Sequence, residues 1–236
     1  MRLRRSAGAG RRRRRRRRRP VGLVRVGEIV GAVTIMVPDP FHSETQVVLV
    51  AALGHQVKDH VRADERLEAA PGRVDLSDPA VPEWRQPYHA GTGALEENQA
   101  KVAQRIKVIE RATNRSVTQL LEDYRGLGCV LRGAALVVGS LSDPEAIGNP
   151  HIRAHALEGR LFRTVLERAL SSHGLACLVV VQSSAYAKAA VALGRTEDKL
   201  RRALADLGRP VSGPWRAEEK LAALAAWMRW TQTPSG

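Results

Sequence analysis

Three residues in one short stretch carry side chains that commonly bind metals. His151, His155 and Glu158 stand at positions i, i+4 and i+7 of a segment whose apolar residues recur with helical periodicity. Residues at this spacing share one helix face, so two imidazoles and a carboxylate are placed to bind a transition metal. Two alternatives stay open. The helix start, with Arg153 and Arg160, can attract an anion, or these polar side chains simply hydrogen-bond locally.

Two lysines form a second pattern, in a chain that has 32 arginines and only six lysines. Lys188 and Lys199 stand on either side of Gly194, on two helices that the glycine separates. An ammonium is a compact point charge, so the pair can contact the phosphates of a nucleic acid. Alternatively, Lys199 forms an ordinary surface ion-pair network with Glu197 and Asp198.

The elements that must position these side chains alternate between strands and helices. Extended, β-branched runs at 26–37 and 47–50, a turn at Gly54 and an alternating run at 57–61 predict a strand and then a hairpin. The segment 72–93 is rich in proline and predicts a loop. Later elements are listed in chain order: a helix over 95–124 that "TNRS" can divide, a buried strand at 134–140, a helix at 151–174, a buried strand at 176–183, and helices around Lys188, at 197–207 and at 218–230.

This order predicts an α/β architecture in which an antiparallel meander continues into parallel strands joined by crossover helices. The prediction places a single domain over residues 24–230. A disordered arginine-rich arm or leader (1–23) precedes it, and a short disordered tail (231–236) follows it.

Four local motifs, together with the order of elements, resemble the RNase H-like superfamily and more narrowly the RuvC-type Holliday-junction resolvases. "DPFHSET" is similar to the family's Asp-Pro turn leading to a threonine, with Asp39 and Thr45 at the family's spacing. "TQVVLVAALGHQVKDHVRA" looks like the family's second and third strands. Asn149 followed by "AHALEG", and the lysine spacing of "KAAVALGRTEDK", are also similar. The resemblance implies an RNase H-like mixed sheet flanked by helices.

The resemblance also implies a catalytic site in which acidic side chains hold two Mg²⁺ ions about 3.5–4 Å apart. Asp39 matches the first acid, and Glu218 and Glu219 stand where the last acids belong, so these are the expected catalytic residues, with Asp39 and Glu219 as metal ligands. Gly139 and Ser140 occupy the position of the second acid. This departure implies a degenerate metal site.

In the same family the lysines face the nucleic-acid backbone, so the resemblance implies that Lys188, Lys199, Thr45 and Asn149 bind nucleic acid. The favoured interpretation is therefore a RuvC-like protein that binds nucleic acid. One alternative is an active Mg²⁺-dependent endonuclease acting on branched DNA. Another is a non-catalytic interaction module that dimerises through the helix at 95–124.

The charge of the chain is concentrated at its start. The formal net charge is +14, yet residues 1–25 hold 13 arginines and no acidic residue, and the remainder carries 25 basic and 24 acidic side chains. The arginine run predicts a phosphate-binding arm, a transit peptide or a dispensable leader. Cys129 and Cys177 lie far apart, without metal spacing, and no apolar run is long enough to span a bilayer. These features predict a cytoplasmic protein without a membrane partner.

Overall fold

The computed structural model describes residues 25–26, 29–30, 32–37, 45–53, 76, 86–90, 94–126, 129–209 and 215–232. Within them, strands and helices occur in the following order: β1 (Arg25–Val26), β2 (Ile29–Val30), β3 (Ala32–Val37), β4 (Thr45–Leu53), α2 (Gln99–Gly126), β5 (Cys129–Val138), η2 (Pro144–Ala146), α3 (Pro150–Ser172), β6 (Cys177–Val181), η3 (Gln182–Ser184), α4 (Ala185–Leu193), α5 (Glu197–Gly208) and α6 (Ala217–Thr231).

The strands β3, β4, β5 and β6 pair in that order, and β1 pairs with β2 separately. The β3–β4 and β4–β5 pairs are antiparallel, whereas β5 and β6 run parallel and are joined by the crossover helix α3. The prediction of a mixed α/β class is therefore confirmed. The RNase H-like meander stays a prediction, because its expected third strand at 57–61 lies outside the described residues.

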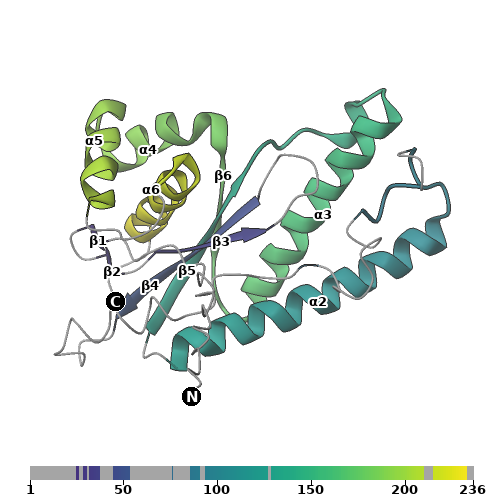
Figure 1. The fold of residues 1–236 in the computed structure, drawn as a ribbon, viewed down its shortest axis with the longest axis horizontal. Coiled ribbons are helices and arrows are strands. Elements are labelled where there is room, and N and C mark those ends of the chain that lie inside the picture. The colour runs from purple at the N-terminus through teal and green to yellow at the C-terminus, as the bar shows by residue number, and fades with distance from the viewer. Residues whose placement is uncertain are drawn as a thin grey trace, which may run out of the picture.

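Alternate side chains of β5 pack into two different hydrophobic clusters. Ala134, Leu136 and Val138 join a cluster with apolar residues of α2 and α3, and Ala135 and Val137 join a cluster formed with α4, α5 and α6. Successive side chains of a strand point to opposite faces, so helices cover this strand on both sides (Figure 1). Within β5, residues 133–138 form a continuous buried apolar run, as predicted for a strand buried on both faces, whereas the exposed Arg132 lies in the first half of the strand.

The long helix α2 differs from its prediction in two ways. It begins at Gln99, not at residue 95, because Leu95 forms a β-bridge with His89 and the Asn98 side chain accepts a hydrogen bond from the backbone N–H of Lys101. It also continues through "TNRS" without a break. Thr113 is fully buried there, so tertiary packing outweighs the low helix propensity of this segment.

The boundaries of the later helices follow from local capping. Asn149 caps α3 by accepting hydrogen bonds from the backbone N–H groups of His151 and Ile152. Gly194 ends α4 with a positive φ of 60°, a conformation that suits glycine, and Thr196 caps α5 two residues later. The predicted separation of two helices at this glycine is confirmed.

Candidate metal centre

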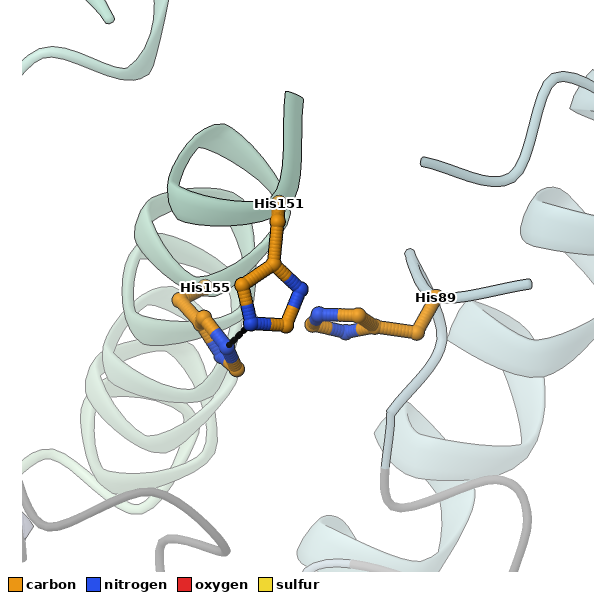
Figure 2. A group of neighbouring side chains, drawn as sticks. All are labelled: His89, His151 and His155. Carbon is orange, nitrogen blue, oxygen red and sulfur yellow. Dashed lines mark hydrogen bonds between the residues drawn. The ribbon is translucent and has the colours of Figure 1, made fainter. Parts of the chain in front are cut away.

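Three histidine rings converge between the start of α3 and the segment 86–90. His151 and His155 lie on consecutive turns of α3, and His89 reaches them from a segment more than sixty residues earlier in the chain (Figure 2). The ring centroid of His89 lies 5.2 Å from that of His151 and 4.4 Å from that of His155. The helical spacing thus pairs two imidazoles on one face, and the tertiary fold adds the third.

The nitrogen positions of the cluster fit a single small cation. The three residues offer ligand atoms that all lie within 4.8 Å of one another. Nε2 of His151 lies 3.2 Å from Nε2 of His155. Two nitrogens bound to one tetrahedral Zn²⁺ at about 2.0–2.1 Å are about 3.3 Å apart. The α3 pair therefore already has the separation that a shared metal requires.

One buried carboxylate orients two of these rings. The side chain of Glu158, which is 5% exposed, accepts a hydrogen bond at Oε1 from Nδ1–H of His89 over 2.8 Å. Its other oxygen, Oε2, lies 3.6 Å from Nδ1 of His155. With the proton of His89 on Nδ1, its Nε2 carries the lone pair that binds a metal. Glu158 is thus placed to orient metal-ligating histidines through their outer nitrogens.

The segment that carries His89 is held by a buried arginine. Nη1 of Arg105, on α2, donates hydrogen bonds to the carbonyl oxygens of Pro87 at 3.0 Å and His89 at 3.1 Å. The Arg105 side chain is 9% exposed and lies 3.5 Å from the carboxylate of Glu96. The backbone N–H of Tyr88 also donates to Oε1 of Glu158. Helices α2 and α3 therefore both fix the position of His89.

Electrostatics favour a neutral imidazole at the centre of the cluster. Burial, followed by the neighbouring His155 and His151, lowers the pKa of His89 to about 4. Because a metal binds the deprotonated nitrogen, His89 is in its ligating form at neutral pH. A neutral ring is also the form that donates one hydrogen bond to Glu158 through Nδ1 and keeps a lone pair at Nε2.

The cluster is closed on one side and open on the other. His89 is only 7% exposed and the side chain of His155 is 25% exposed, whereas His151 is exposed. Within the described residues, no further histidine, cysteine or acidic side chain joins the three-residue group. The described ligand set is therefore three imidazoles, with the least covered ring facing solvent.

Neither Glu218 nor Glu219, the two described carboxylates expected from the resemblance, is part of this cluster. Asp39 lies outside the described residues. Glu219 is buried in the first turn of α6, where its Oε2 accepts a 2.7 Å hydrogen bond from the backbone N–H of Arg216. Glu218 is partly exposed beside it. The structure thus gives Glu219 a helix-capping contact. The approach of Glu218 and Glu219 to Asp39 stays a prediction.

The residues expected to bind nucleic acid lie on different elements. Lys188 on α4 and Lys199 on α5 are both exposed, on helices that follow one another around Gly194. Thr45 is the first residue of β4 and pairs with Val37 on β3. Asn149 caps α3, as described above. The structure therefore brings Asn149 beside the histidine cluster through its bond to His151.

The sequence singled out His151, His155 and Glu158 but missed His89. The short motif "PYHAG" carries no helical spacing, and its position beside α3 depends on contacts with Arg105 and Leu95. The one available signal was a histidine in a proline-rich loop, a segment type in which binding residues are common.

Comparisons with protein families, with curated proteins and with solved structures found no match. Among the helices in the described part of the chain, none has the length and apolar character needed to cross a membrane.

Proposed function

We propose that this protein binds one divalent transition-metal ion through His89, His151 and His155, with Zn²⁺ as the preferred ion. The observation that carries the proposal is the convergence of three imidazoles, two of which face a single buried carboxylate through their outer nitrogens. Metal-ligating histidines almost always donate their second ring N–H to such a group.

The ligand type favours a transition metal over Mg²⁺. Imidazole nitrogens suit Zn²⁺, Cu²⁺, Ni²⁺ and Fe²⁺, whereas Mg²⁺ prefers oxygen ligands in octahedral geometry. Zn²⁺ has no strong geometric preference and is stable with three protein nitrogens and one further ligand. The Mg²⁺ predicted from the resemblance depends on Asp39, which lies outside the described residues, and stays a separate prediction.

Burial supports a ligand-binding role over simple local hydrogen bonding. A buried carboxylate is costly unless it is paired and hydrogen-bonded. Glu158 accepts hydrogen bonds from Tyr88 and His89, and Nδ1 of His155 lies 3.6 Å from its other oxygen. The third ring, His151, completes a group of three imidazoles whose ligand atoms lie within 4.8 Å of one another.

The test is a metal titration of the full chain by isothermal titration calorimetry, with metal content checked by mass spectrometry. We expect the wild-type protein to bind one Zn²⁺ at this site and no Mg²⁺ there. His155→Ala should remove that binding step, because it deletes the ring shared between His151 and Glu158.

His173→Ala is the matched control. This histidine follows the last turn of the same helix and contacts Thr118, away from the cluster. The proposal is wrong if Zn²⁺ does not bind, or if His155→Ala and His173→Ala leave the titration equally unchanged.

A second candidate is the nucleic-acid-binding function of an RNase H-like, RuvC-type protein. The observation in its favour is the exposure of Lys188 and Lys199 on consecutive helices, since phosphate-binding lysines must reach solvent. Catalysis by Asp39, Glu218 and Glu219 with Mg²⁺, and dimerisation through the helix predicted at 95–124, stay predictions beside it.

This candidate is tested by measuring binding to branched DNA over a series of salt concentrations. Replacing Lys188 and Lys199 together with alanine should reduce the slope of log affinity against log salt by about 2, because each phosphate contact contributes about 1. Lys107→Ala combined with Arg115→Ala, two exposed positions on α2, is the control for net charge. Equal effects of the two double variants would assign the binding to nonspecific charge, including the arginine run.

A further inference from the structure

The exposure of the three histidines changes steadily across the cluster. His89 and Glu158 form its buried side, His155 is partly covered, and His151 is exposed. We propose that solvent occupies the fourth position of the bound metal, so that the centre performs hydrolytic chemistry instead of serving as a structural clamp. This inference rests on the metal-binding function proposed above.

The number of protein ligands is the first argument. Structural zinc sites are closed by four protein ligands, whereas catalytic sites use three and keep one position for water or substrate. The group formed by the described residues contains three ligands. A water molecule can reach the remaining position from the side of His151, because that residue lies in the exposed first turn of α3.

The charge of the ligand set is the second argument. Three neutral imidazoles leave the full +2 charge on the metal, whereas thiolate or carboxylate ligands would neutralise part of it. A metal with this uncompensated charge acidifies its bound water strongly, to a pKa of about 7 for a His₃ zinc site compared with about 9 for aqueous Zn²⁺. Metal-bound hydroxide would therefore be available at neutral pH.

The position of Glu158 separates its role from that of the nucleophile. Its Oε1 accepts from His89 and Tyr88, and its Oε2 faces Nδ1 of His155, so both oxygens lie on the outer side of the ligand rings. Glu158 is therefore a positioning residue, and the hydroxide needs no adjacent general base. This arrangement predicts simple metal-hydroxide chemistry on an accessible electrophile.

The reaction class is the hydrolysis of an activated carboxylic ester, for which p-nitrophenyl acetate is the probe. The hydroxide oxygen forms a bond to the carbonyl carbon, and the bond from that carbon to the aryl oxygen then breaks. Acetic acid and p-nitrophenolate would leave. The proton lost when the water ionised and the proton that acetic acid releases near neutral pH would both go to solvent. A new water molecule then occupies the metal, so the cycle needs no other reactant.

The experiment uses the full chain loaded with Co²⁺ or Zn²⁺. Visible spectra of the Co²⁺ protein report its coordination, and azide is added as an exogenous ligand for the open position. We expect azide to change the spectrum, and the Zn²⁺ protein to hydrolyse the ester at least ~10-fold faster than an equal concentration of free Zn²⁺. The rate should rise with pH through a midpoint of about 7.

The controls separate this inference from the metal-binding proposal. His173→Ala should retain both the azide response and the hydrolysis, and the apoprotein should show neither. If Co²⁺ binds but azide leaves its spectrum unchanged and the ester is not hydrolysed, the site is structural and the inference is wrong, while the metal-binding function stands. If neither metal binds, both proposals are wrong.

Discussion

The histidine cluster and the C-terminal region of the molecule differ in the burial and the contacts of their polar side chains. At the start of α3, His151 and His155 meet His89 and Glu158, and the last two of these four are almost fully buried. In the C-terminal region, Lys188 and Lys199 point to solvent, and Glu219 caps its own helix.

This contrast indicates which sequence patterns carry functional information. A charged side chain on an exposed helix face or at a helix start has a sufficient local explanation in solvation or capping. A buried cluster assembled from segments far apart in sequence does not, because desolvating several polar groups must be offset by specific interactions. Convergence of buried polar groups therefore outweighs spacing as a sign of a site.

Removing one metal ligand from the cluster should change the Zn²⁺ affinity most. His151→Ala should weaken Zn²⁺ binding by more than the ~100-fold upper range of outer-shell substitutions, because it deletes a direct ligand. His151 is exposed, so the apoprotein should keep its stability. Glu218→Gln in the C-terminal region should leave Zn²⁺ affinity unchanged. Isothermal titration calorimetry measures the Zn²⁺ affinities of both variants. Equal affinities would contradict the assignment of the metal site to the histidine cluster.

The next effect concerns the carboxylate behind the ligands. Glu158→Gln should weaken Zn²⁺ binding by about 10–100-fold, the usual cost of changing an outer-shell partner. The amide can accept a hydrogen bond only through its oxygen, so its NH₂ group would face one of the two Nδ1 atoms near Glu158.

Glu167→Gln is the control for this variant. Glu167 lies on the same helix, and its Oε1 is 3.8 Å from Nε of Arg163. Circular dichroism should show that both variants are folded. An affinity for Zn²⁺ that is the same in Glu158→Gln and Glu167→Gln would contradict the positioning role.

The two regions also differ in how far the sequence predicted them. The helices α3, α4, α5 and α6 lie close to their predicted positions, because caps, a glycine stop and apolar periodicity are local signals. The buried strand predicted at 134–140 is also present, but β5 begins at Cys129 and ends at Val138. The i, i+4 pair of histidines was predicted for the same reason. His89 was not, because its approach to α3 depends on long-range contacts that no local pattern encodes.

A smaller effect is expected where α2 holds the His89 segment. Arg105→Lys should lower the free energy of unfolding by about 1.5 kcal/mol. The lysine Nζ lies one bond closer to Cα than the arginine Nη1, so the variant loses the charge-assisted hydrogen bonds to the carbonyl oxygens of Pro87 and His89. Chemical denaturation measures this change. Zn²⁺ should stabilise both proteins, and the difference between them should be at least as large with the metal as without it, because a His89 that is held less firmly binds the metal no more tightly.

Arg111→Lys is the matched control on the same helix, because Arg111 is exposed and its Nε donates to the carbonyl oxygen of Lys107 one turn earlier. This variant should unfold at the wild-type denaturant concentration. If Arg105→Lys behaves identically, the two carbonyl contacts do not hold the segment, and the rigidity assigned to the cluster is lost.

The smallest effect tests whether the C-terminal glutamate is structural. Glu219→Ala should cost about 1 kcal/mol of unfolding free energy, since it removes the acceptor for the backbone N–H of Arg216 at the start of α6. Glu218→Ala should cost less, because that carboxylate is partly exposed and its interaction with the helix dipole is weaker than a buried hydrogen bond. Both variants should bind Zn²⁺ as the wild type does. A loss of metal affinity in Glu219→Ala, measured beside its denaturation curve, would instead place this glutamate in a metal site and overturn the division between the two regions.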